Sequence, residues 1–293
     1  MSERAIVLVV LSAFLHASWN IFSKSSGDPI SFLLRALAFS ALLYAPLFVW
    51  MQFHVHYPPV VVGCLLGSGI CAGVYFFCLG KAYHHGRVSV AYPVARSFPI
   101  LVVMFGGFFL SEFPNAQGTT GVLLVVAGCF VLPWERFVRG PEGFCLANYH
   151  NRSVFWALGA AALTSAYSLL DKIAAASMAA GAESTIVEKV NYVYLQNLIA
   201  WGAAVVCVRV ARYRVLPVAR RRAFLCGAIF LVSYTLVLLA LATDPVAYVV
   251  SFRQLSIVLG TLVSMFWIER SFSWPRVVGV GMIFTGVVLV GLA

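Results

Sequence analysis

The chain has 293 residues, of which 62% are hydrophobic and only 10% are charged, and its mean hydropathy is +0.94. A soluble domain carries roughly 25% charged residues, and a chain this apolar would expose large apolar patches in water and aggregate. The composition therefore argues against a soluble enzyme, a nucleic-acid-binding protein and a disordered protein. It predicts an all-α membrane protein that crosses the bilayer several times.

The apolar segments of the chain have the length of membrane spans. A bilayer core about 30 Å thick requires roughly 20 apolar residues in a helix that rises about 1.5 Å per residue. Ten transmembrane helices are therefore expected, at 5–23, 30–52, 59–80, 88–111, 117–133, 153–177, 187–210, 222–241, 246–268 and 274–292. A polar stretch divides them into two sets of five, so we expect units at 5–132 and 154–292 with a linker at 133–153.

The basic residues predict the orientation of the chain. The net charge is +10, and Lys and Arg collect in cytoplasmic loops, where they also face anionic lipid. The loops after the first, third, fifth, seventh and ninth expected helices, together with the helix ends that border them, hold 14 of the 20 Lys and Arg residues. This bias predicts a cytoplasmic linker and both termini outside, in the cell (inner) membrane. No basic stretch is interleaved with aromatic stacking residues, so we expect membrane lipid and not nucleic acid as a partner.

The two halves resemble each other when they are aligned on charged residues. Arg96 and Glu112 correspond to Arg253 and Glu269, both at an offset of 157 residues. At an offset of 148, the first helices also align, and His16, Trp19, Asn20 and Lys24 correspond to Thr164, Tyr167, Ser168 and Lys172. Each half has an odd number of helices, so the second would cross the membrane the other way up. Such inverted repeats are typical of secondary transporters, with the site where the halves meet; chance similarity between apolar sequences is the alternative.

The opening of the chain resembles a known family. The stretch Leu-His-Ala-Ser-Trp-Asn at 15–20, followed by Lys24, is similar to the opening of EamA-type members of the drug/metabolite transporter superfamily. Glu112 and Glu269, each at the end of a fourth helix, resemble that family's repeat signature. The resemblance implies ten helices, a central cavity lined by helices 1, 3 and 4 of each half, and peripheral fifth helices. A fainter resemblance is to a subgroup associated with phosphonate utilisation.

Arg96 and Arg253 are the main candidates for binding a substrate. A charge deep in a bilayer costs at least ~2.5 kcal/mol on insertion scales, so it marks a functional candidate by default. The two residues approach the membrane centre from opposite faces in their expected helices. Two guanidinium groups in one cavity would favour a carboxylate, phosphate or phosphonate, which they can hold with paired hydrogen bonds. Structural pairing, for example with Asp171, and snorkelling to the surface are the alternatives.

Polar and aromatic residues within the apolar helices are candidates for the cavity wall. His16, Trp19 and Asn20 share one face of the first helix because they are three to four residues apart. Amphipathic rings can line a cavity and orient an organic solute through their O–H and N–H groups. The expected substrate-binding residues are Arg96, Arg253, Trp19, Asn20, Tyr75, Tyr92, Tyr167, Tyr234 and Gln254. An interfacial aromatic belt is the alternative for tyrosines near helix ends.

Two residues are candidates for coupling transport to protons. Histidine titrates near neutral pH, so His16 is one candidate, and a hydrogen-bonded histidine between packed helices is an equally good interpretation. Asp171 is the other candidate. Its alternative is a local ion pair with Lys172 at the end of the sixth expected helix.

These residues predict a secondary active transporter of a small organic metabolite with an anionic group, such as an amino acid, organophosphate or phosphonate. Alternating access is the expected mechanism, and export is the direction that the family resemblance implies. Efflux of cationic or apolar drugs, with structural arginines, is one alternative. A membrane-embedded enzyme acting on lipid-linked substrates is another, with His84 and His85 in a short basic loop as its best dyad. No nucleotide- or metal-binding motif is present, so we expect no cofactor, no metal and no enzymatic activity; the oligomeric state stays open.

Overall fold

The computed structural model describes residues 1–24, 26–53, 55–86, 94–97, 99–140, 145, 150–179, 185–263, 265–266 and 272–293. Its helices are α1 (Glu3–Lys24), α2 (Pro29–Gln52), α3 (Pro59–His85), α5 (Pro99–Leu110), α6 (Ala116–Val131), α7 (Arg152–Ala179), α8 (Ile186–Val210), α9 (Arg220–Leu241), α10 (Val246–Phe252), α11 (Leu255–Val263) and α12 (Trp274–Leu292). Within these ranges, eight helical segments are long and apolar enough to cross a membrane, with α10 and α11 counted as one. The protein is therefore an integral, multi-pass membrane protein.

The helices begin where the sequence carries capping chemistry. Pro29 and Pro59 stand in the first turns of α2 and α3, where the N–H that proline lacks would have no partner within the helix. Thr185 and Glu188 form a capping box at the start of α8, in which each side chain binds a backbone amide of the other residue. The side chain of Asn115 accepts a hydrogen bond from the amide of Gly118 at the start of α6. These caps satisfy backbone groups that lipid cannot satisfy.

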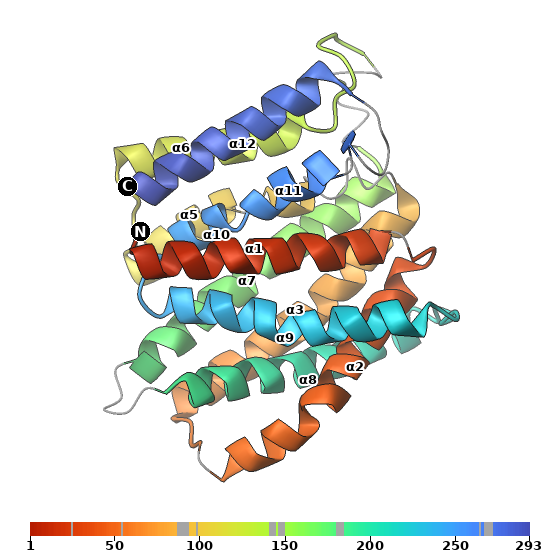
Figure 1. Cartoon of the computed structure of the whole chain (residues 1–293), viewed down its shortest axis with the longest axis vertical. Coiled ribbons are helices and arrows are strands. Elements are labelled where there is room, and N and C mark those ends of the chain that lie inside the picture. The colour runs from red at the N-terminus through yellow and green to blue at the C-terminus, as the bar shows by residue number, and fades with distance from the viewer. Residues whose placement is uncertain are drawn as a thin grey trace.

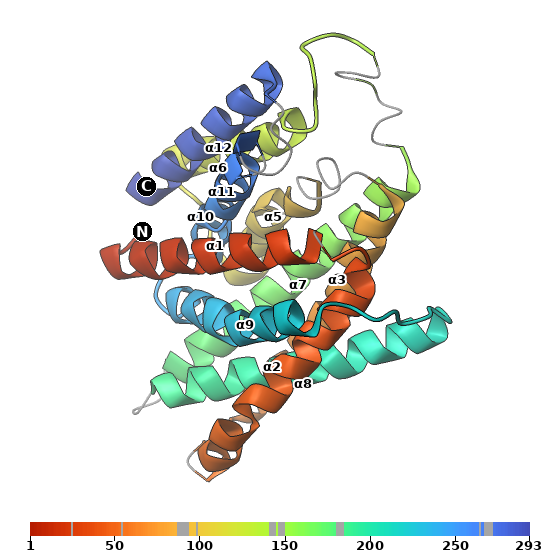
Figure 2. The same ribbon diagram turned by 45° about the vertical axis from the view of Figure 1, so that its right-hand side comes forward.

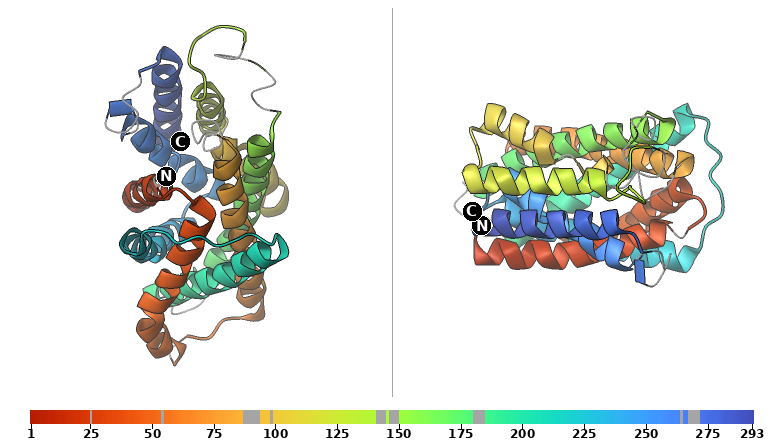
Figure 3. Two further views of the ribbon diagram at one scale, coloured as in Figure 1. Left: turned by 90° about the vertical axis from the view of Figure 1, so that its right-hand side faces the viewer. Right: turned by 90° about the horizontal axis from the view of Figure 1, so that it is seen from above.

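Helices from the first half of the chain pack mainly against helices from the second half. α1 contacts α9 and α11, whereas α3 contacts α7 and α8 (Figure 1). α2 contacts α8 and α9, and α5 contacts α7 and α10. α6 and α12 pack on each other at one edge of the molecule, as Figures 1 and 2 both show. Both termini lie at the same end (Figure 3), where the N-terminal ammonium donates to the Gly291 carbonyl at 3.4 Å.

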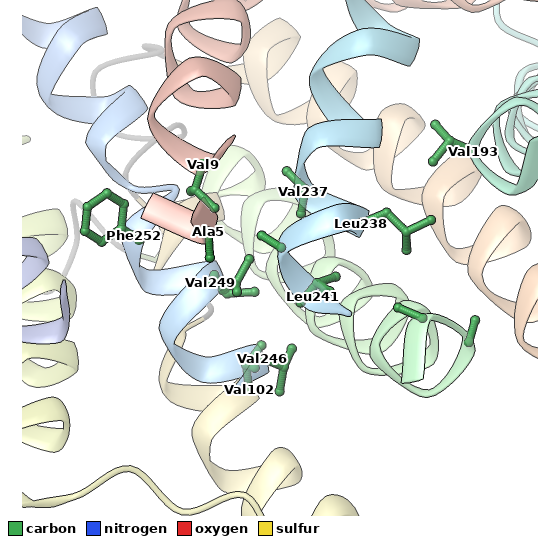
Figure 4. Packing of buried hydrophobic residues seen from close by; sticks show 14 of the residues in the cluster. Ala5, Val9, Val102, Val193, Val237, Leu238, Leu241, Val246, Val249 and Phe252 are labelled. Atoms are coloured by element: carbon green, nitrogen blue, oxygen red, sulfur yellow. The ribbon is translucent and has the colours of Figure 1, made fainter. Parts of the chain in front are cut away.

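A buried hydrophobic cluster joins α1, α5, α9 and α10. Figure 4 shows Val9 of α1, Val102 of α5, Leu241 of α9 and Val246 of α10 among its members. These four side chains are fully buried. Lipid tails are as apolar as these side chains, so close van der Waals packing, more than escape from water, holds such helices together.

Two glycine pairs bring α6 and α12 into backbone contact. A Cβ atom at Gly286 of α12 would lie 2.5 Å from the carbonyl oxygen of Gly121 in α6, and one at Gly128 would lie 2.8 Å from that of Gly279. Small residues let membrane helices approach this closely. This contact lies at the edge of the molecule, away from the centre of the bundle (Figure 1).

Valine at Gly286 should lower the melting temperature of the protein. Its side chain would overlap the Gly121 carbonyl, and overpacking of this kind typically costs about 1–3 kcal/mol. Valine at Gly281 is the matched control, because no atom lies within 4 Å of a Cβ at that position of the same helix. Thermal unfolding of both purified variants in one detergent tests the contact, and equal melting temperatures would contradict it.

The prediction of one continuous ninth helix over 246–268 is wrong, because the structure divides this segment into two helices. α10 ends at Phe252 and α11 begins at Leu255. Between them the amide of Gln254 bonds the carbonyl of Ser251 at 3.1 Å, three residues back and not four, which tightens the chain into a turn. No proline or glycine stands at this break, so no local signal in the sequence indicates it.

The expected fourth helix, 88–111, is also interrupted. Residues 94–96 form a helical turn, and the amide of Ser97 bonds the carbonyl of Val94 at 3.1 Å. α5 then starts at Pro99, which has no N–H to continue the preceding helix. Residues 88–93 lie outside the part of the chain that the structure describes.

Two helices run further than expected. α3 continues through His85, so His84 and His85 occupy its exposed last turn and do not form a loop. α7 continues to Ala179, which places Asp171 and Lys172 inside the helix and not at its end.

Candidate functional site

A cavity lies among α1, α3, α7, α8, α9 and the break between α10 and α11. Its empty space, counted together with the solvent at its mouth, is about 610 Å³. Its wall includes six of the residues expected at the site, namely His16, Trp19, Tyr75, Tyr167, Tyr234 and Arg253. The cavity therefore receives side chains from both halves of the chain.

Aromatic rings form much of the cavity wall and hold one another in place. Tyr167 meets Tyr75 and Tyr234 edge to face, with ring centroids 5.8 and 5.9 Å apart. Trp19 meets Phe230 in the same way at 5.1 Å. Edge-to-face contacts are the favoured geometry of aromatic pairs, so these rings offer a defined apolar surface to the body of an organic solute.

Arg253 places a positive charge on this aromatic wall. Its side chain is 4% exposed, and its guanidinium lies over the ring of Tyr234, 5.4 Å from the ring centroid. The Nη1 atom is buried and has no hydrogen-bond partner among the described residues. A buried donor without an acceptor is costly, so this nitrogen is suited to a ligand that supplies one.

Arg96 lies close by but does not belong to the described cavity wall. Arg96 belongs to the helical turn at 94–96, and its side chain is 2% exposed. Both Arg96 and Arg253 are near enough to His16 to interact electrostatically with its imidazole. The two guanidinium groups thus contribute positive potential to the same region, from the two interrupted helices.

Asp171 is completely buried directly behind the cavity wall. Its carboxylate accepts hydrogen bonds from Tyr192 Oη at 2.8 Å and from Gln196 Nε2 at 2.9 Å, and from the hydroxyl of Tyr234. Gln196 and Tyr234 themselves line the cavity. Tyr234 therefore joins the two charges, because its ring lies under the guanidinium of Arg253 and its hydroxyl binds Asp171.

The expected ion pair between Asp171 and Lys172 is wrong. Adjacent residues on a helix point in different directions, and Lys172 Nζ instead lies 3.2 Å from Glu112 Oε1 and donates to the carbonyl of Asp244 at 2.8 Å. The other carboxylate oxygen of Glu112 accepts from the amide of Val246 at 2.9 Å. This network joins α5, α7 and the start of α10 at the end of the molecule that holds both termini.

The side chain of Asp244 strengthens that network from the loop between α9 and α10. Burial by itself would raise the pKa of this carboxyl, but hydrogen bonds from Ser2 and Thr243 outweigh burial and lower the pKa below its ordinary value. The Ser2 amide and hydroxyl both lie 2.8 Å from the carboxylate. The N-terminal residues are therefore tied to the loop.

Two further expected site residues lie elsewhere. Asn20 donates to the carbonyl of His16 at 2.8 Å and lies outside the described cavity wall. Gln254 is fully buried in the break after α10, and its amide atoms have no hydrogen-bond partner among the described residues. Tyr92 falls outside the residues that the structure describes.

α8 contributes residues to the site that were not expected from the sequence. Gln196 and Asn197 line the cavity, and Tyr192 binds Asp171. Amide side chains within an apolar helix are a usable signal, because a polar group inside a membrane requires a partner in the protein. Within the described residues, no group of three His, Cys, Asp or Glu side chains is placed to hold a metal ion.

Glutamine at Glu112 should destabilise the protein by about 1–3 kcal/mol, because it leaves the partly buried ammonium of Lys172 without its charged partner. Glutamine at the exposed Glu3 is the matched control, since it removes the same charge at the same end of the molecule. Melting temperatures measured at low and high salt check the effect. A loss no larger than that of the control would show that the ion pair is not a stabilising contact.

Comparison with known proteins agrees with the resemblance noted in the sequence. The EamA-like transporter family matches residues 3–133, which confirms the interpretation of the opening stretch. No curated protein sequence matches the chain. A crystal structure described only as that of a protein matches 100% of this chain and 98% of its own, with a TM-score of 0.70 and 21% identity. At that identity the likeness concerns the fold alone.

Proposed function

We propose a specific transport activity for this chain, which is a membrane transporter of small solutes of the EamA type. It is a secondary active transporter of a small organic metabolite with an anionic group, such as an amino acid, organophosphate or phosphonate. It works by alternating access, and export is the direction that the family resemblance implies. The observation that carries the proposal is Nη1 of Arg253, which is buried on the wall of the cavity and has no hydrogen-bond partner among the residues that the structure describes.

Two inverted five-helix halves form the transporter in this proposal. The contact of α1 with α9 has a counterpart in that of α3 with α7, and the contact of α1 with α11 has one in that of α5 with α7. The bond from Ser97 to Val94 also has a counterpart, at the offset of 157 residues, in that from Gln254 to Ser251, both at 3.1 Å. Reciprocal contacts of this kind are what a pseudo-two-fold axis in the membrane plane would produce.

In this proposal α6 and the segment formed by the turn at 94–96 and α5 also cross the membrane, although they are shorter, and the spans then number ten. An even number of spans agrees with termini at one end of the molecule (Figure 3). We place both termini on the outer side of the cell (inner) membrane. The linker at 133–153 and the connection between α8 and α9 then lie in the cytoplasm. Six exposed arginines support this orientation, two of them in that connection and four in the adjoining ends of α8 and α9: Arg209, Arg212, Arg214, Arg220, Arg221 and Arg222.

In this proposal the residues at the cavity have different roles in binding the solute. Arg253 anchors the anionic group, and Arg96 adds positive potential from behind the wall. Trp19, Tyr75, Tyr167 and Tyr234 hold the body of the solute. Contact of the solute with Asn20, Tyr92 or Gln254 stays a prediction from the sequence.

Glutamine at Arg253 should weaken the binding of an anionic solute at least tenfold, since a hydrogen bond to a charged group contributes about 1.5–3 kcal/mol. Thermal shifts of purified protein against amino acids, phosphonates, sugar phosphates and cationic drugs would identify the solute and measure the loss. Glutamine at Arg209, an exposed residue of α8, is the matched control. Unchanged affinity for every anionic ligand, with stabilisation by cationic drugs, would support the drug-efflux alternative.

Asparagine at Asp171 should abolish accumulation of the solute against its gradient but leave exchange of solute across the membrane intact. We propose that Asp171 takes up a proton that is transported together with the solute in each cycle. The amide of asparagine cannot take up a proton in this way. Proteoliposomes with an imposed pH gradient measure accumulation, and counterflow without a gradient is the control in the same variant. Accumulation that persists in the variant would show that Asp171 is not the proton site.

A further inference from the structure

The hydrogen bond between Trp19 and His16 determines which nitrogen of His16 carries a proton. The indole N–H of tryptophan can only donate, and Nε1 of Trp19 lies 3.1 Å from Nδ1 of His16. Nδ1 is therefore the acceptor and has no hydrogen of its own. In a neutral imidazole one nitrogen accepts and the other donates, so the hydrogen of His16 is on Nε2.

Packing holds this arrangement in place. The ring of Trp19 meets the imidazole edge to face, with centroids 4.6 Å apart, and meets Phe230 on α9 at 5.1 Å. Trp19 is 3% exposed. The indole therefore has little freedom to turn away, and the carbonyl of His16 is also bound by the side chain of Asn20 at 2.8 Å.

Nε2 of His16 is consequently a donor, and none of the described residues supplies its acceptor. The atom is buried without a hydrogen-bond partner in the described part of the chain, and His16 is 6% exposed on the cavity wall. Nη1 of Arg253, on the same wall, is also buried without a hydrogen-bond partner among the described residues. Two buried donors without acceptors at one cavity indicate a ligand with acceptor oxygens.

A second proton on His16 would disturb these contacts. It would place an N–H at Nδ1 opposite the N–H of Trp19, and two donors cannot bond each other. It would also add a positive charge within electrostatic reach of Arg96 and Arg253. A residue that carries protons must gain and lose one in each cycle, and the surroundings of His16 oppose that step.

We propose that His16 binds the substrate as a neutral hydrogen-bond donor and is not the proton carrier. Nε2–H of His16 and Nη1–H of Arg253 together hold the oxyanion of the solute, a carboxylate or a phosphonate, while the aromatic wall holds its body. Trp19 is a positioning residue, because it fixes the tautomer of His16. The inference rests on the proposed function, since it places the anionic solute in the same cavity.

Binding of three probes tests the inference: phenylacetate, phenylphosphonate and the neutral phenylacetamide. Alanine at His16 should weaken binding of the anions about ten- to hundredfold and change binding of phenylacetamide little. Alanine at His84, which is exposed on the last turn of α3, is the matched control and should change neither. The anion that binds with the higher affinity identifies whether the site prefers a carboxylate or a phosphonate.

The outcomes separate the two proposals. If the unaltered protein binds neither anion, the proposed function fails and the inference fails with it. If it binds an anion that Arg253→Gln weakens but His16→Ala does not, the inference alone is overturned.

Nitrogen-15 NMR of labelled histidine in the unaltered protein gives a readout that needs no variant to fold. The His16 signals should be those of the Nε2–H tautomer and should stay constant between about pH 6 and 8, the range in which an ordinary histidine titrates. Phenylalanine at Trp19 should restore exchange between tautomers. An Nδ1–H tautomer, or titration within this range in the unaltered protein, overturns the inference.

Discussion

The interior of a membrane offers no partner to a charged side chain, and this constraint shapes the centre of the protein. Arg253 and Asp171 are both buried, and they are joined through one residue, Tyr234. An isolated charge in this environment would be several kcal/mol less stable than one that is paired. The aromatic ring and the hydroxyl of Tyr234 stabilise both charges, and Nη1 of Arg253 still has no hydrogen-bond partner within the described part of the chain. The arrangement therefore keeps a cation available to a ligand inside the bilayer.

This linkage also gives a physical route from the binding of a solute to the binding of a proton. A solute oxyanion on Arg253 would compete with the ring of Tyr234 for the guanidinium, and the hydroxyl of Tyr234 is shared with Asp171. Gln196 connects the same carboxylate to the cavity wall from α8. In the proposed cycle, occupation of the cavity and protonation of Asp171 thus act on the same side chains.

The contacts outside the cavity hold the bundle in a different way. The pair of α6 and α12 relies on glycines that bring backbones together, which suits a rigid pair of helices at the edge. Near the termini, Lys172 and Glu112 connect α7 to α5 across the two halves. The end of the molecule that holds the termini therefore combines a tight hydrophobic cluster (Figure 4) with the ion pair of Lys172 and Glu112.

The sequence by itself determined the class of protein, the positions of most helices and six of the residues on the cavity wall. Composition, span length and turn residues act locally, and a buried arginine in an apolar segment is conspicuous wherever the helix lies. Only the tertiary structure decided that Lys172 pairs with Glu112 and not with Asp171, that the helix of Arg253 is broken, and that α8 supplies Gln196. These features depend on which helices face one another across the bundle. No local pattern encodes that choice, because apolar helices in lipid select their neighbours by the fit of side chains that are far apart in the chain.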